Sequence, residues 1–129
     1  MTSYAMTVTL DTGYADAVER TRAALAEQGF GVLTEIDVAA TMKAKLNADL
    51  LPQIILGACN PPLAHRALGL EPSIGLLLPC NVVVRSIDET HTLVEAMDPA
   101  VMVTATGNPE LEPVATEARA KLSAAIESL

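Results

Sequence analysis

Apolar and polar residues alternate with a period of two over several short segments, which is typical of half-buried β-strands. Met6–Leu10 and Phe30–Asp37 show this alternation. Gln53–Cys59 is apolar on both faces, which favours an inner strand of a sheet. Cys80–Ile87 is rich in β-branched residues, and Thr92–Asp98 follows it after a four-residue turn. These last two segments predict a hairpin.

Helical spacing of apolar residues predicts two long amphipathic helices. The first comes after the first strand, and Asp11 or Thr12 is its expected N-cap. Gly29 ends it, because glycine readily adopts the left-handed conformation found after a helix. The second comes after Asn108-Pro109 and carries an apolar stripe over residues 111–129, the clearest amphipathic pattern in the chain.

Two shorter helices are predicted between the long ones. Val38–Asn47 forms the first of them. Asn60 and Pro61 begin the second, because asparagine is a good N-cap and proline is favoured at the first helical position. Gly69 ends this helix, and Glu71–Pro79, which contains proline, glycine and serine, predicts a loop.

This order of elements predicts an α+β fold: a two-layer sandwich in which helices cover one face of a mostly antiparallel five-stranded sheet. No linker, repeat or low-complexity tract divides the sequence, so we expect a single domain over residues 1–129. The third and fourth strands are apolar on both faces, and a two-layer fold leaves one sheet face open. We therefore expect a homodimer in which a second subunit covers that face or the sheet edge.

The composition limits the possible partners. Apolar residues make up 50% of the 129 residues, which is enough for a substantial core. Only 2% are aromatic, so the chain offers no stacking platform for single-stranded nucleic acid. The net charge of −8 repels phosphate backbones. We expect no nucleic-acid partner.

Segments that would direct the chain to a membrane are not evident. No apolar run approaches the roughly 18 residues of a transmembrane helix, and the first residues lack the features of a signal peptide. Two cysteines are too few for a secreted disulfide scaffold. We expect a cytoplasmic protein that does not contact a membrane.

The two cysteines occupy the most informative positions. Cys59 ends the third predicted strand, Cys80 begins the fourth, and an asparagine follows each. If these strands pair antiparallel, the cysteines meet at one rim of the sheet. The helix that Asn60 caps would lower a thiol pKa, whereas the apolar strand would raise it and the two prolines remove N–H donors. A small buried residue is the plain alternative.

Two thiols at one rim permit several chemistries. They could form a redox disulfide or supply two ligands to a soft metal. A zinc site needs about four ligands, and the chain has only two histidines. His65 is near enough to Cys59 in sequence to supply a base or a ligand, whereas His91 lies at the far end of the fourth strand. The sequence assigns no complete metal-ligand set.

Charged residues in the predicted strands form a second group of candidates. Glu35 and Asp37 share one strand face, where a carboxylate pair can act as acid and base or bind a cation. A solvated strand face is the simpler interpretation. Arg85 lies in a valine-rich strand and needs a carboxylate partner, for which Glu35 and Glu95 are the candidates. Glycine-rich nucleotide-binding motifs are absent.

Four further features occur in order along residues 14–102: FGVLTEID at 30–37, Cys59-Asn60-Pro61 with Ala67-Leu68 after it, GLLLPCNVVV at 75–84, and Met97-Asp98-Pro99. Together they resemble the domain of unknown function 302 family. The resemblance implies a compact α+β domain that often forms dimers, and it implies no activity. Many members carry Phe-Gly before the Asn-Pro step, where this chain has Ala58-Cys59.

These observations predict a domain that binds a small ligand or a cation at the Cys59/Cys80 rim. One alternative is a thiol-based redox enzyme or carrier that uses both cysteines. Another is a structural or partner-binding dimer without catalysis. No reaction, catalytic residue or cofactor is assigned. The candidate ligand-binding residues are Cys59, Asn60, His65, Cys80, Glu35 and Arg85.

Overall fold

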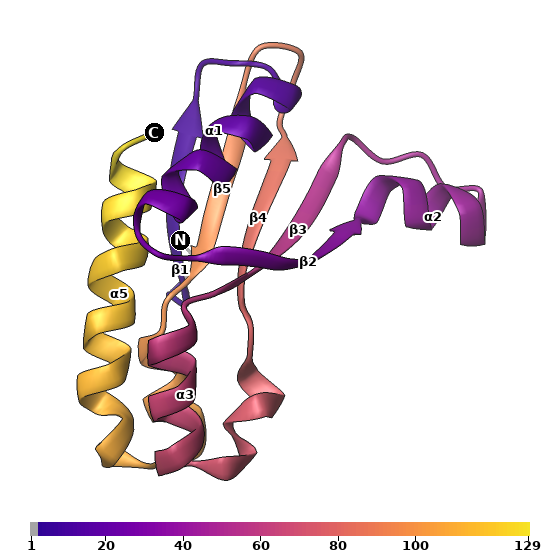
Figure 1. Ribbon diagram of the computed structural model, residues 1–129. Helices are drawn as coiled ribbons and strands as arrows, with labels where there is room; N and C mark the ends of the chain where they lie inside the picture. Colours follow the sequence, from indigo (N-terminus) through magenta and orange to yellow (C-terminus); the bar gives the residue numbers. More distant parts are fainter. Residues whose placement is uncertain (1–2) are drawn as a thin grey trace.

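The computed structural model describes residues 3–129 and contains one five-stranded sheet (Figure 1). The strands are β1 (Ala5–Leu10), β2 (Gly31–Asp37), β3 (Gln53–Cys59), β4 (Cys80–Ser86) and β5 (Thr92–Met97). They lie in the order β1-β5-β4-β3-β2, and every neighbouring pair is antiparallel. The predicted hairpin is therefore present as β4 and β5, and β3 is an inner strand as expected.

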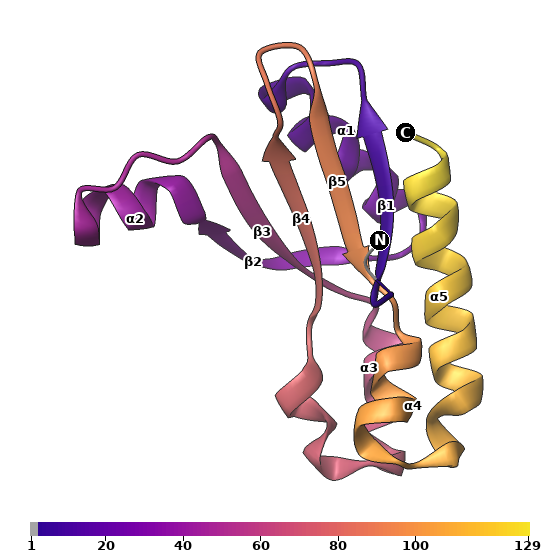
Figure 2. The ribbon, with the colours of Figure 1, turned by 180° about the vertical axis from the view of Figure 1, so that it is seen from behind.

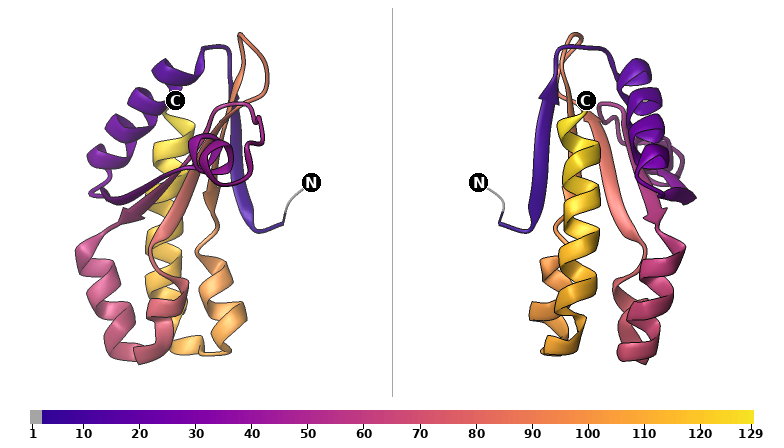
Figure 3. Two further views of the ribbon diagram at one scale, coloured as in Figure 1. Left: turned by 90° about the vertical axis from the view of Figure 1, so that its right-hand side faces the viewer. Right: turned by 60° about the vertical axis from the view of Figure 1, so that its left-hand side comes forward.

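The helices connect these strands or follow them. They are α1 (Tyr14–Glu27), α2 (Val38–Leu46), α3 (Pro61–Leu70), α4 (Ala100–Thr106) and α5 (Glu112–Glu127), with short 3₁₀ turns η1 (Pro72–Leu77) and η2 (Pro109–Leu111). Helices α1 and α5 pack on one face of the sheet, and Figure 3 shows both on the same side of the strands. The predicted two-layer α+β sandwich is confirmed.

Alternation along the strands builds the main core. Val82 and Val84 on β4, Leu56 on β3 and Val94 on β5 point to the helix layer and are fully buried. Leu122 of α5 meets them from the helix layer. Because few aromatic residues are available, aliphatic side chains fill this layer almost alone.

A second apolar cluster lies beyond one end of the sheet, where α3, α4 and the first half of α5 come together (Figure 2). Its fully or nearly buried members include Leu63 of α3, Ile74 of η1, Met102 of α4 and Leu111 of η2. The sequence patterns did not predict α4. Its β-branched residues have weak helix propensity, so the packing of Met102 and the left-handed Gly107 after the helix explain why it forms.

Two local expectations were wrong. The N-cap of α1 is Gly13, not Asp11 or Thr12, because the Thr12 hydroxyl donates instead to the Asp16 carboxylate at 2.8 Å. The register of β2 shifts between Val32 and Thr34, so these residues do not share a face as simple alternation predicted. The shift places Glu35 beside Leu56, on the face that the helices cover.

The segment between β2 and β3 projects sideways from the sheet (Figures 1 and 2). We call residues 37–52 the arm; its helix is α2. Asp37 caps this helix by accepting a hydrogen bond from the Ala40 N–H at 2.9 Å, and the left-handed Asn47 follows it. No residue of α2 is buried.

Candidate functional site

The turn at Asn60 fixes one end of the sheet. Its side-chain carbonyl accepts a hydrogen bond from the Leu63 N–H at 3.4 Å, which confirms Asn60 as the N-cap of α3. Its side-chain amide donates to the Gln28 carbonyl, also at 3.4 Å, at the C-terminus of α1. Asn60 therefore ties three elements together, and both ends of its side chain are already occupied.

The two cysteines lie on neighbouring antiparallel strands. Ala58 is the residue directly opposite Cys80, so Cys59 is one position from that pairing. Both thiols are free, Cys59 partly exposed and Cys80 buried. Successive side chains of a strand point to opposite faces, so Cys59 and Cys80 approach this end of the sheet from different sides.

Both cysteines line one small cavity of about 30 Å³ between the end of the sheet and the second apolar cluster. The other lining residues are Phe30, Ala58, Asn60, Leu63, Ala64, Ala67, Leu78, Pro79, Met102, Val114 and Ala118. This space holds about two water molecules. Since the Asn60 side chain already makes two hydrogen bonds, the other lining residues whose side chains carry a donor atom for a ligand are Cys59, Cys80 and Met102.

Gly57 shapes the approach to this cavity. A Cβ atom at this position would collide with the Thr34 hydroxyl and would lie only 2.8 Å from Cγ of Pro79. Glycine thus allows β2 and the segment before β4 to close over β3. Pro79, which follows a cis peptide bond, also lines the cavity. The wall beside the cysteines can therefore form only because Gly57 has no side chain.

Burial controls the protonation of Cys80. Burial, together with a smaller contribution from the nearby Cys59, raises the pKa of this thiol to about 11. Cys80 is therefore a neutral thiol at pH 7. Its conversion to a thiolate requires either strong base or a ligand, such as a metal ion, that displaces the proton.

His65 does not join the cysteines. It is exposed on α3, whereas Leu63 and Ala67 of the same helix are buried and line the cavity. A residue two positions from each of them lies on another face of the helix. His65 therefore does not supply a base or a metal ligand to this cavity, contrary to the expectation from the sequence.

The charged candidates lie apart from the cysteines and have partners of their own. Arg85 contacts Glu95 through Nε and Oε1 at 3.1 Å, which confirms the predicted pairing. Glu35 instead contacts Arg22 of α1 at 2.6 Å, and this hydrogen bond lowers the pKa of Glu35. Asp37 caps α2. Glu35 and Asp37 therefore do not act together as a carboxylate pair.

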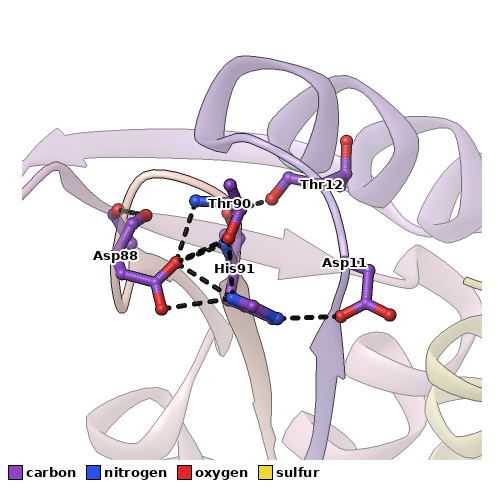
Figure 4. A network of polar contacts seen from close by, with 7 residues as sticks. Asp11, Thr12, Asp88, Thr90 and His91 are labelled. Atoms are coloured by element: carbon purple, nitrogen blue, oxygen red, sulfur yellow. Dashed lines mark hydrogen bonds and ion pairs between the residues drawn. The ribbon is translucent and has the colours of Figure 1, made fainter.

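The densest polar network lies at the opposite end of the sheet, in the β4–β5 turn (Figure 4). His91 Nδ1 lies 3.0 Å from Oδ1 of Asp88, and His91 Nε2 lies 3.0 Å from Oδ1 of Asp11. The backbone N–H groups of Thr90 and His91 donate to Asp88 at 2.8 Å. The sequence patterns placed His91 in a turn but missed its contact with Asp11, which is distant in sequence.

This network perturbs both of its central groups. Hydrogen bonds from the Thr90 backbone and from His91 lower the pKa of Asp88 to about 2. The hydrogen bond to Asp88, supported by the charges of Asp88 and Asp11, raises the pKa of His91. The network holds the hairpin turn against the loop before α1, where the Thr92 hydroxyl also donates to the Thr12 carbonyl at 2.9 Å.

Residues 3–129 bring together no group of three or more His, Cys, Asp or Glu side chains suited to hold a metal ion. Within the same residues, no helix combines the length and the apolar character needed to cross a membrane. A metal at the cysteine cavity would therefore depend on sulfur ligands, with at most two of them from cysteine.

Fold and cavity together define a small α+β domain with an apolar, sulfur-lined cavity at one end of an antiparallel sheet. The chain belongs to the DUF302 family: the family model described as "Domain of unknown function DUF302" matches residues 6–129. This confirms the resemblance found in the sequence and extends it beyond residues 14–102.

A crystal structure of an uncharacterized conserved DUF302 protein from Bacillus stearothermophilus is similar to this chain. The sequences are 30% identical, the TM-score is 0.88, and the match covers 98% of each chain. No curated protein matches the chain. The relatives therefore establish the fold and the family and attach no activity to them.

Proposed function

We propose that this protein binds a small ligand at the cavity lined by Cys59 and Cys80, and that the ligand is a soft metal cation. The observation that carries the proposal is that both cysteines of the chain, distant in sequence, line the same cavity. The pairing of β3 with β4 brings them to this place. Only part of Cys59 is exposed to solvent, so an ion could enter from its side.

The size and chemistry of the cavity favour an ion over an organic molecule. A volume of about 30 Å³ is well below the roughly 150 Å³ that accommodates benzene in a protein core. The lining is otherwise apolar, and Asn60 uses both ends of its amide within the protein. An organic ligand would find little room and few polar partners.

Among cations, Cu(I) fits this ligand set best. Thiolates and thioethers are soft ligands that select Cu(I), and the cavity offers two thiols together with the Met102 thioether. Zinc is a poorer fit because a structural zinc site needs about four ligands. Cu(I) binding would displace the thiol protons, so the affinity should increase with pH.

An anaerobic titration with Cu(I) against a chromogenic Cu(I) chelator tests this proposal. The wild-type protein should withdraw one equivalent of copper from the chelator. Cys59→Ala and Cys80→Ala should each reduce the affinity at least tenfold, and Met102→Leu should reduce it less. His65→Ala and His91→Ala are matched controls that remove the imidazoles outside the cavity and should leave binding unchanged.

Two outcomes would contradict the proposal. One is that the wild-type protein fails to compete with the chelator. The other is that binding survives in a folded variant that lacks both cysteines. Circular dichroism of each variant identifies a loss of binding that comes from unfolding.

A thiol redox function is the second candidate, because the cysteines lie one position apart on neighbouring strands. Oxidation to a disulfide would remove two protons and two electrons and would require an external oxidant. The raised pKa of Cys80 opposes it, because a neutral thiol is a poor nucleophile in disulfide formation. Loss of both free thiols, and of two hydrogen masses, on mild treatment with diamide would favour this function over metal binding.

A further inference from the structure

The lining of the cysteine cavity divides into a partly exposed mouth and a buried floor. The partly exposed lining residues, which form the mouth, are Cys59, Asn60, Ala64, Leu78 and Pro79. The other lining residues are buried and form the floor. Cys80 is 7% exposed and Met102 is 2% exposed, so both belong to the floor. The three sulfur-bearing side chains therefore lie at different depths, with Cys59 outermost.

Contacts within the protein hold the mouth in place. The Asn60 amide is hydrogen-bonded at both ends, to the Leu63 N–H and to the Gln28 carbonyl. Pro79 packs against the backbone of Gly57, where a Cβ atom would lie only 2.8 Å from Cγ of the proline. Because these contacts join the mouth to α1, α3 and β3, we expect the opening to keep its size when a ligand arrives.

The cavity is too small to admit a metal complex as a whole. Its volume of about 30 Å³ holds about two water molecules, which leaves room for a bare ion but not for an ion with organic ligands attached. A molecule that delivers the ion must therefore stay outside and pass the ion to the first protein ligand that it reaches. Of the three sulfur-bearing side chains in the lining, Cys59 is the one at the mouth.

The chemistry of the mouth limits which molecules can deliver the ion. Among residues 3–129, those that line the cavity include none with a charged side chain or an imidazole. A hydrated cation therefore finds no carboxylate or imidazole to replace its water. A thiol at the mouth can instead replace a thiolate ligand of a soft metal, because the metal keeps the kind of ligand that it prefers. A thiolate complex of Cu(I) is the class of donor that suits this mouth.

We propose that the protein takes Cu(I) from a low-molecular-weight thiolate complex by ligand exchange that begins at Cys59 and is completed at Cys80. This inference rests on the proposed function of the cavity. In the first step the Cys59 sulfur bonds to the copper of Cu(SR)₂⁻, one Cu–SR bond breaks, and the departing thiolate takes the Cys59 proton. In the second step the copper moves inward, the Cys80 sulfur replaces the remaining thiolate, and that thiolate takes the Cys80 proton.

This exchange balances without an oxidant or a reductant. Copper stays Cu(I) throughout, and one negative charge is present on the copper complex before and after the transfer. The products are copper bound by two cysteine thiolates and two molecules of the free thiol RSH. An intermediate in which copper joins Cys59 to one donor thiolate follows from the different depths of the two cysteines, and it distinguishes this route from direct entry of the ion.

Anaerobic native mass spectrometry after mixing with a Cu(I)–glutathione complex tests the order of exchange. Wild-type protein should gain the mass of one copper and no glutathione. Cys80→Ala should retain copper together with one glutathione, because the second protein thiol is missing. Cys59→Ala should form no such mixed complex and should take up copper at least about tenfold more slowly than wild type in stopped-flow mixing, since its remaining thiol is buried. His65→Ala is the matched control from outside the cavity and should behave as wild type.

The possible failures of this inference differ from a failure of the proposed function. A mixed complex on Cys59→Ala but not on Cys80→Ala would overturn the order of exchange, and wild-type protein that keeps glutathione would overturn its completion at Cys80. Copper uptake from the chromogenic chelator but not from the glutathione complex would contradict the donor class and leave the site intact. No uptake from either source would overturn both proposals. If an alanine variant unfolds, the corresponding serine variant replaces it.

Discussion

The two ends of the sheet contain the same kinds of elements but opposite chemistry. At the hairpin end, His91 lies between Asp88 and Asp11, and the nearby backbone and hydroxyl groups donate to Asp88. At the cysteine end, Cys59 and Cys80 line an apolar cavity and the one amide there is occupied. The hairpin end is exposed and saturated with hydrogen bonds, whereas the cysteine end keeps unused ligand atoms.

Close polar groups therefore do not by themselves define a binding site. The hairpin groups satisfy one another, and a ligand would have to displace those bonds before gaining its own. The cysteine cavity requires no such exchange, because both of its cysteine thiols are free. This contrast supports a structural role for the hairpin end and is the reason for proposing ligand binding at the cysteine end.

The largest expected effect concerns the reactivity of the two thiols. In native protein at pH 7, Cys59 should react with a disulfide reagent at least 100-fold faster than Cys80, because Cys80 is buried and its pKa is raised to about 11. The measurement is a time course of labelling, with Cys59→Ala identifying the fast phase. Equal labelling rates for the two thiols in folded protein would contradict the description of Cys59 as accessible and Cys80 as enclosed.

The next largest effect is expected on stability when Gly57 is replaced, because this residue allows the wall of the cysteine cavity to close. Gly57→Ala should lower the free energy of unfolding by about 1–3 kcal/mol, since the new Cβ collides with Thr34 and crowds Pro79. Gly75→Ala, where nothing lies within 4 Å of the added atom, should change it by less than about 0.5 kcal/mol. Urea denaturation measures both. Equal stability of the two variants would contradict the close packing described here.

Arg85 lies at neither end of the sheet, and its replacement should have a smaller effect on the free energy of unfolding. Its side chain is 43% exposed and pairs with Glu95 on the open face. Partly exposed ion pairs contribute up to about 1 kcal/mol, so Arg85→Met should reduce the stability of the protein by no more than that. Urea denaturation of the wild-type protein and of Arg85→Met measures this difference in the free energy of unfolding. A loss of several kcal/mol would mean that the pair is effectively buried.

The smallest effect is expected from the pH dependence of the hairpin end. The folded-state pKa of His91 is raised, so protonation of His91 favours the folded protein. This stabilisation is fully present below the ordinary histidine pKa of about 6.5 and is lost as pH rises through the folded-state pKa. The difference in melting temperature between wild type and His91→Ala should therefore shrink from pH 5.5 to pH 9 (about the range a histidine spans).

Much of the fold could be predicted from the sequence because its signals are local. The alternation in β1, the N-cap at Asn60 and the apolar stripe of α5 each depend on neighbouring residues, and all three are present. The pairing of Arg85 with Glu95 was also accessible, because both lie in one predicted hairpin. Helix α4 was missed because tertiary packing outweighs its weak propensity.

The candidate site was only partly accessible from sequence. The meeting of Cys59 and Cys80 at one rim followed from antiparallel pairing, but the role of Met102 depends on how α4 packs, which no local pattern reveals. Glu35 and Asp37 share a strand face as the alternation predicted, but the irregularity between Val32 and Thr34, which sets Glu35 beside Leu56, has no signal in the sequence. The contact of His91 with Asp11 joins residues far apart in sequence and has no local signal.

Anomalous diffraction at the copper absorption edge, from crystals of the Cu(I)-loaded protein, would locate the metal in the fold. We expect one strong peak in the cavity, within bonding distance of the sulfur atoms of Cys59 and Cys80. A peak between His91 and the carboxylates of Asp88 and Asp11 would reverse the assignment of the two ends. Copper in the crystal with no peak beside either cysteine would also contradict it.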